Sequence, residues 1–140
     1  VDWVTFSKKG DRILSGSVDR TVKMWDLKGR IVLDISDAHA DEIRSVEFSP
    51  DMRRIISASQ DRTAKIWDLT GRLLRTLSGH GYYLRTAFFS PGKGDSIVTA
   101  SGDGTAIVWP SADGVDRKIH NDEFYRLTDE DLTRLGIHIH

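Results

Sequence analysis

Three tryptophans stand 42 residues apart along the chain, at Trp25, Trp67 and Trp109. The segments that end at these tryptophans match each other, reading SVDRTVKMW, SQDRTAKIW and SGDGTAIVW. Upstream of each segment a second phrase recurs at nearly the same spacing, as VTFS, VEFSP and AFFSP. A period of this length indicates that the chain repeats one supersecondary unit, which buries its apolar surface only against neighbouring units.

Each unit has the pattern of four short β-strands. In the second repeat we expect strands at residues 43–49, 54–58, 64–67 and 73–77, separated by Ser-Pro-Asp, Gln-Asp-Arg and Thr-Gly-Arg turns. Short strands joined by tight turns at this spacing indicate antiparallel, all-β structure. In the third repeat the third strand should end at Pro110, which lacks a backbone donor, and residues 115–119 are the expected fourth strand.

Over residues 1–110 the chain resembles the WD40-repeat family. The resemblance implies a β-propeller with three four-stranded antiparallel blades, either part of a larger propeller or completed by oligomerisation. We expect a first repeat at residues 1–37, truncated on its N-terminal side, and further repeats at 38–78 and 79–119. Residues 120–140 form the expected C-terminal tail, which includes a short helix.

In this family a His, a Ser or Thr, an Asp and a Trp form a hydrogen-bonded tetrad in each blade. The resemblance implies two complete sets here and one set that lacks its His. They are His39, Ser57, Asp61 and Trp67; His80, Thr99, Asp103 and Trp109; and Ser15, Asp19 and Trp25.

Ser, His and Asp together also suggest a hydrolase. A catalytic triad is needed once, however, whereas this set recurs at the same register in both complete repeats, so we assign it to the structure of the turns. Residues 92–95, Gly-Lys-Gly-Asp, resemble a phosphate loop only superficially, because the spacing is wrong and a strand follows. His138 and His140 could hold a metal, but the simpler interpretation is a disordered terminus. We expect no cofactor.

The family resemblance implies that protein or peptide partners dock on the narrow top face of the propeller. The residues expected there are Asp2, Glu42, Arg44, Gln60, Tyr82, Tyr83 and Arg85, together with Val18 and Gly102. Arg and Tyr are frequent in interface hot spots. The alternative is that these long polar side chains are simply solvated. Trp3, at a position where the other repeats have Ser45 and Thr86, could plug the central channel or contact something outside the chain.

Twenty Lys and Arg residues are balanced by twenty-one Asp and Glu residues, so no sequence-wide basic field attracts nucleic acid or a membrane surface. No apolar run is long enough for a membrane helix. Cysteine is absent, which excludes a disulfide framework and favours a cytoplasmic location. Because the chain opens with Val1 on a strand-like pattern, we expect its natural start to lie upstream.

The tail has helix signals, with Thr128 as N-cap and Gly136 as C-terminal stop. Its sequence resembles the end of bacterial multidomain WD40 proteins, including signalling NTPases whose sensor is a propeller; a partner-binding amphipathic motif is the alternative. The remaining blades should come from upstream sequence or from another chain. We therefore expect a non-catalytic interaction scaffold or sensor module, and the alternative is an enzyme or small-ligand-binding propeller that uses its central pocket.

Overall fold

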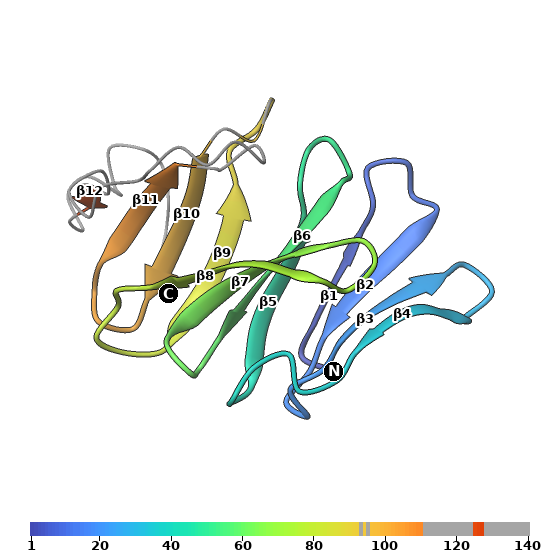
Figure 1. Ribbon diagram of the computed structural model, residues 1–140, viewed down its shortest axis with the longest axis horizontal. Coiled ribbons are helices and arrows are strands. Elements are labelled where there is room, and N and C mark those ends of the chain that lie inside the picture. Colours follow the sequence, from blue (N-terminus) through green and yellow to red (C-terminus); the bar gives the residue numbers. More distant parts are fainter. Residues whose placement is uncertain (93, 95, 111–124, 128–140) are drawn as a thin grey trace.

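The three repeats fold into three four-stranded antiparallel sheets that stand side by side (Figure 1). This computed structural model describes residues 1–92, 94, 96–110 and 125–127. The first sheet has strands β1 (Trp3–Phe6), β2 (Arg12–Gly16), β3 (Val22–Asp26) and β4 (Ile31–Ile35). The second has β5 (Ile43–Phe48), β6 (Arg54–Ser59), β7 (Thr63–Asp68) and β8 (Leu73–Ser78). The third has β9 (Leu84–Phe89), β10 (Ser96–Ser101), β11 (Ala106–Pro110) and β12 (Tyr125–Leu127).

The strands predicted in the second repeat are confirmed, and their ends lie within one residue of those of β5 to β8. Strand β11 extends to Pro110, where the missing backbone donor predicts its end, and the residues that follow lie outside the described part of the chain. The turn between the second and third strands of each sheet holds one residue in the left-handed region. Its φ is 70° at Arg20, 72° at Arg62 and 81° at Gly104, so only the third repeat has the residue that adopts this geometry without strain.

The fourth strand of the third sheet differs from the prediction. The strand that pairs with β11 is Tyr125–Leu127, with Ala106 opposite Leu127 and Val108 opposite Tyr125. The expected strand at residues 115–119 lies outside the described residues, as does the expected helix after Thr128. The third sheet therefore crosses the boundary expected at residue 119 and takes its outer strand from the segment that we expected to be the tail. Because a long segment separates β11 from β12, no tight-turn pattern in the sequence marks the two strands as partners.

Apolar side chains from adjacent sheets form the core. One buried cluster joins Leu14, Val22 and Met24 of the first sheet to Val46 and neighbouring residues of the second. The sheets approach so closely here that a Cβ on Gly16 would lie 2.6 Å from the Cγ2 atom of Ile43. Glycine at this position therefore allows the first two sheets to stack.

A second buried cluster joins the next pair of sheets, through Ile56, Ala64 and Ile66 on one side and Ala87 and Phe89 on the other. The Ala87 N–H also donates to the buried Ser45 Oγ at 3.1 Å, which links the first strands of the two sheets. The first strands of the second and third sheets, β5 and β9, thus each pack their apolar face on the sheet that precedes them.

The corresponding face of the first sheet is uncovered. Val4 occupies the register position of the buried Val46 and Ala87, because each pairs with the hydroxyl residue of the second strand. Val4 and Phe6 are nevertheless 61% and 64% exposed. The first sheet therefore presents to solvent the same apolar surface that the other two sheets bury.

No helix in the described part of the chain is long and apolar enough to cross a bilayer.

Candidate functional site

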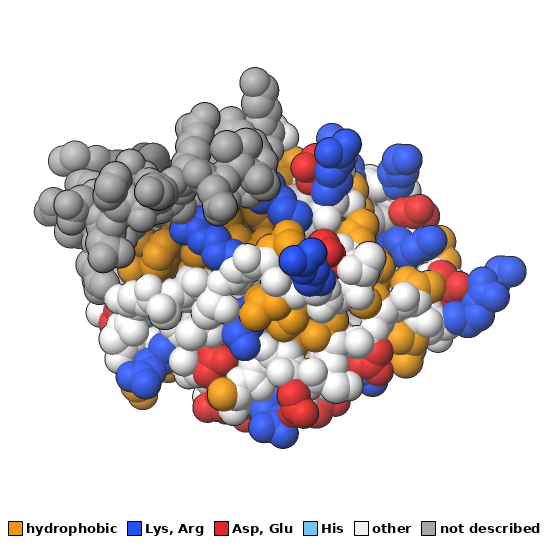
Figure 2. All heavy atoms as spheres, in the orientation of Figure 1, with side chains coloured by type: hydrophobic (Ala, Val, Ile, Leu, Met, Phe, Trp, Pro, Cys, Tyr) orange, Lys and Arg blue, Asp and Glu red, His pale blue; other side chains and the backbone are white. Residues whose placement is uncertain are grey.

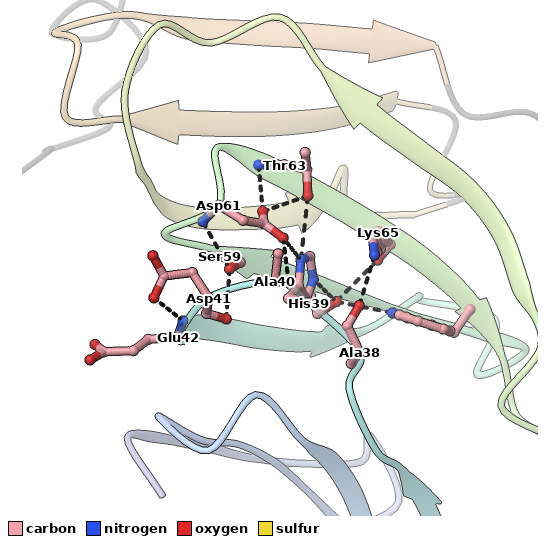
Figure 3. A network of polar contacts seen from close by, with 11 residues as sticks. Ala38, His39, Ala40, Asp41, Glu42, Ser59, Asp61, Thr63 and Lys65 are labelled. Atoms are coloured by element: carbon pink, nitrogen blue, oxygen red, sulfur yellow. Dashed lines mark hydrogen bonds and ion pairs between the residues drawn. The ribbon is translucent and has the colours of Figure 1, made fainter.

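A hydrogen-bonded set of four side chains connects the loop after the first sheet to the second sheet. Figure 3 shows His39 of this set beside Asp61 and Thr63. The Nδ1 atom of His39 lies 2.8 Å from Asp61 Oδ2, and its Nε2 atom lies 2.7 Å from Ser57 Oγ. The Trp67 indole N–H donates to the same Ser57 Oγ at 3.0 Å. The four residues come from a loop, a strand, a tight turn and the next strand, so the contacts form only when β6 and β7 are paired.

The hydrogen bonds of this set run from Trp67 through Ser57 and His39 to Asp61, and the donor and acceptor roles follow from the groups at its two ends. The indole N–H only donates and an ionised carboxylate only accepts. With the imidazole proton on Nδ1 facing Asp61, His39 Nε2 accepts the Ser57 hydroxyl proton, and that hydroxyl accepts from Trp67. Every polar atom of the set is then satisfied, which a buried network requires.

Asp61 also fixes the backbone around it. Its Oδ2 accepts the Ala40 N–H at 3.1 Å, and its Oδ1 accepts the Thr63 N–H at 2.9 Å and the Thr63 hydroxyl at 2.6 Å. Burial alone would raise the pKa of Asp61, but hydrogen bonds from His39 and Thr63 outweigh it, and the pKa lies well below the ordinary value. The carboxylate is therefore ionised and holds the tight turn at neutral pH.

The loop residue Ala38 joins the two sheets directly. Its N–H donates to the Arg20 carbonyl of the first sheet at 3.0 Å, and its carbonyl accepts from Lys65 Nζ of the second at 2.9 Å. Ala38 is fully buried between them. The connection between the sheets is thus fixed at both ends.

The third sheet has the same arrangement. His80 Nδ1 lies 3.1 Å from Asp103 Oδ2, its Nε2 lies 2.8 Å from Thr99 Oγ1, and the Trp109 indole N–H donates to Thr99 Oγ1 at 2.9 Å. Burial would raise the pKa of Asp103, but bonds from Thr105, the Gly81 N–H and His80 lower it well below the ordinary value.

The first sheet brings together only part of a set. The Trp25 indole N–H donates to Ser15 Oγ at 2.8 Å. Asp19 accepts the Thr21 N–H at 3.0 Å and the Thr21 hydroxyl at 2.6 Å, as its counterparts do in the other two turns. Asp19 is exposed, whereas Asp61 lies beneath a His-bearing loop.

Sequence reasoning missed a serine that lies two residues before each turn Asp. Ser59 Oγ donates to the Asp41 carbonyl at 3.0 Å and accepts the Asp61 N–H at 3.1 Å. Ser101 makes the same contacts with the Tyr82 carbonyl and the Asp103 N–H. The signal was present, because a serine recurs at this position in all three repeats, as Ser17, Ser59 and Ser101.

These geometries do not suit a hydrolase. Ser57 and Thr99, the only candidate nucleophiles in the two sets, are fully buried. Their hydroxyls are also engaged by indole and imidazole nitrogens, so neither is held as a free nucleophile. Within the described residues no group of three or more His, Cys, Asp or Glu side chains is arranged to hold a metal, and His138 and His140 lie outside those residues.

The sequence matches the family model described as WD domain, G-beta repeat, at residues 1–26, 31–68 and 71–110. These matches cover most of the chain. The protein belongs to the WD40-repeat family. Its repeats are not the same units as its sheets, because the match at residues 31–68 runs from β4 of the first sheet to the end of β7 in the second. The second and third matched repeats therefore each supply the outer strand of the preceding sheet, β4 and β8.

WD40 domains generally act as protein-interaction modules, so the loops at the His-bearing end of the blades are of interest. Four residues expected at an interaction surface lie together there, across the first two blades. Arg44 lies 4.0 Å from Asp2 and 3.6 Å from Glu42, and Gln60 Nε2 donates to Glu42 Oε2 at 2.8 Å. All four residues are at least partly exposed, and together they carry a net negative charge.

A second group lies at the same end of the third blade. The Tyr82 and Tyr83 rings are 4.7 Å apart at 56°, and the Arg85 guanidinium stacks 5.4 Å from the centre of the Tyr83 ring. A Cβ on Gly102 would come within 2.7 Å of the Tyr83 ring, so the absence of a side chain at Gly102 lets the ring lie there. We call the residues of both groups the rim: Asp2, Glu42, Arg44, Gln60, Tyr82, Tyr83 and Arg85.

Two other expected residues have separate places. Val18 is exposed in the β2–β3 turn of the first blade. Trp3 begins β1 opposite Gly16 and is partly exposed.

Proposed function

We propose that this protein is a cytoplasmic interaction scaffold or sensor module, without catalysis of its own, which binds a protein or peptide through the rim. The observation that carries the proposal is the collection of Tyr, Arg and carboxylate side chains on loops whose backbones are already fixed. Preorganised loops lose little conformational entropy on binding. Aromatic and Arg side chains contribute most to the affinity of interfaces.

The two parts of the rim favour different groups on a partner. Asp2 and Glu42 flank Arg44, which leaves an acidic surface that suits a Lys or Arg of the partner. Tyr82, Tyr83 and Arg85 offer an aromatic and cationic surface that suits an apolar or acidic residue. We propose a partner segment that carries both kinds of residue and spans the blades.

We also propose that further blades complete the propeller. The exposure of Val4 supports this, because the surface that covers its counterparts Val46 and Ala87 is the apolar face of a preceding blade. Phe6 is exposed beside it on the same strand. Closure into a ring removes such open faces in propellers.

The interaction is tested with a peptide selected from a random library on the immobilised full chain. We expect Tyr82→Ala and Arg85→Ala to weaken this peptide by about tenfold or more, since hot-spot truncations cost roughly 2 kcal/mol. Gly102→Ala should weaken it too, because its Cβ displaces the Tyr83 ring. Thr76→Ala, on the exposed surface of β8, is the control and should leave the affinity unchanged. Equal affinities for all four variants would refute the rim as the binding surface.

The same measurement separates scaffold from enzyme. A scaffold with a substitution at His80 should bind its peptide in proportion to the fraction of folded chain. An enzyme built on the His80–Asp103 pair would lose turnover while remaining folded.

A further inference from the structure

The end of the blades opposite the rim carries a repeated turn whose sequence is only partly explained by folding. The β3–β4 and β7–β8 turns both read Asp-Leu-x-Gly-Arg, at residues 26–30 and 68–72. The Asp builds the turn, since Asp26 Oδ1 accepts the Lys28 and Arg30 N–H groups at 2.9 and 3.0 Å. Asp68 accepts the Thr70 and Arg72 N–H groups in the same way.

The leucine of this turn has no comparable structural role. Leu27 is 63% exposed and Leu69 is 37% exposed, although aliphatic side chains gain free energy from burial. Lys28 and Arg72, beside them, are exposed and form no ion pair within the described residues. Each turn therefore offers an apolar side chain next to a cation.

Two inner turns, β1–β2 and β5–β6, lie at the same end as the outer turns β3–β4 and β7–β8, and they add more cations. Lys8, Lys9 and Arg53 are exposed and have no ion-pair partner in the described part of the chain. The carboxylates of these turns are bound locally, with the Ser7 hydroxyl donating to Asp11 at 2.8 Å and the Ser49 hydroxyl donating to Asp51 at 2.6 Å. The carboxylates thus hold the turns while the cations project from them.

The described charges are unevenly divided between the two ends, although the whole chain is nearly neutral. At the end opposite the rim the basic residues are Lys8, Lys9, Arg12, Arg53 and Arg54 in the inner turns, with Lys28, Arg30 and Arg72 in the outer turns; the acidic ones are Asp11, Asp26, Asp51 and Asp68. At the end that carries the rim, the described carboxylates outnumber the cations; they are Asp2, Asp19, Asp37, Asp41, Glu42, Asp61 and Asp103 against Arg20, Arg44, Arg62 and Arg85. Figure 2 shows most blue side chains over the upper and right-hand part of the molecule and most red ones along its lower edge.

We propose that this basic end, formed by the β1–β2, β3–β4, β5–β6 and β7–β8 turns, binds an acidic protein segment that also carries leucine-like side chains. The segment's carboxylates meet Lys8, Lys9, Lys28, Arg53 and Arg72, and its apolar side chains cover Leu27 and Leu69. This surface is separate from the rim and does not depend on the function proposed for it.

The turn carboxylates favour a peptide over a nucleic acid or a lipid surface. Hydroxyl and backbone N–H groups lower the pKa of Asp11, Asp26, Asp51 and Asp68, so each turn carries a fixed negative charge beside its cations. A phosphate backbone or an anionic bilayer presents continuous negative charge, which these carboxylates repel. A peptide can place its acidic side chains at the cations alone.

The test uses fluorescence anisotropy with the full chain and a labelled peptide that repeats Asp-Glu-Leu four times. We expect saturable binding at about 50 mM salt that weakens as salt screens the charges. Lys9→Ser with Arg53→Ser should weaken binding about three- to tenfold, as expected for the loss of two exposed charge pairs. Arg20→Ser with Arg62→Ser, which removes two cations from the opposite end, is the matched control and should have no effect.

A second comparison tests the leucines. Leu27→Ser with Leu69→Ser should weaken the Asp-Glu-Leu peptide about threefold or more, but should leave a peptide that repeats Asp-Glu-Ser unaffected. The proposal is overturned if the wild-type chain does not bind the Asp-Glu-Leu peptide. It is overturned too if the Lys9→Ser, Arg53→Ser double variant and the Arg20→Ser, Arg62→Ser control weaken binding equally. It is also overturned if a thymidine oligonucleotide or phosphatidylserine vesicles bind the wild-type chain more tightly than the peptide does.

Discussion

The Nδ1 atom of His39 lies 2.8 Å from the Oδ2 atom of Asp61, although His39 belongs to the loop that leaves the first blade and Asp61 to a turn of the second. The same relationship joins His80 to Asp103 one blade later. Each pair closes a loop of more than twenty residues onto the blade that follows. Side chains that resemble a catalytic site thus join one blade to the next.

Asp61→Asn should destabilise the protein by about 1–3 kcal/mol, because it removes the charge that receives hydrogen bonds from His39, Ala40 and Thr63 in a largely buried site. Urea denaturation followed by tryptophan fluorescence measures the change. Asp37→Asn is the control: Asp37 pairs with Arg20 at 3.2 Å on the surface, and its loss should cost about 0.5 kcal/mol or less. Equal effects of the two substitutions would contradict the assigned role of Asp61.

The folded protein should lose stability in acid through Asp61 and Asp103. Both have a pKa well below 3.8 when folded, so the unfolded chain binds more protons as the pH falls through that value. Their contribution is complete at neutral pH and declines from about pH 5 downward. The urea midpoint should therefore fall less between about pH 6 and about pH 3 in the Asp61→Asn, Asp103→Asn double variant than in the wild type. Parallel pH profiles would contradict this prediction.

Gly16→Ala should cost about 1–3 kcal/mol, because its Cβ would overlap Ile43 Cγ2 and press on Val46 Cγ1 at 3.0 Å. Ala58 occupies the same register position in the second blade without difficulty, so the cost comes from the neighbour and not from the strand. A double-mutant cycle with Ile43→Ala measures the coupling. Additive effects of the two substitutions would show that the clash is not the cause.

Val4→Ser with Phe6→Ser should convert the isolated chain from an associating to a monomeric species, because the pair forms the uncovered blade face. Light scattering measures the change against the chain mass of 15.8 kDa. The counterpart Val46→Ser should instead unfold the protein, since Val46 is fully buried. A wild-type chain that is already a monodisperse monomer would rule out association through this face.

The parts of the fold that depend on nearby residues could be predicted from the sequence. Strands β5 to β8 were placed within one residue, since hairpin strands and their turns are specified locally. The outer strand β12 was misplaced because its pairing with β11 spans a long segment with no repeat signal. Ser59 and Ser101 were overlooked although the repeat contains them, because their acceptors are backbone carbonyls that no side-chain pattern reveals.

The sequence by itself determined the period, the strand order and the residue types that recur at each turn, because 42-residue repetition records local requirements that each blade meets again. Only the tertiary structure decided which of these residues form hydrogen bonds with one another, which surface of the first blade is uncovered, and at which end the cations gather. Those features depend on contacts between blades and on the direction in which each side chain points. Nearly equal numbers of cations and carboxylates along a chain do not determine how its two ends share them.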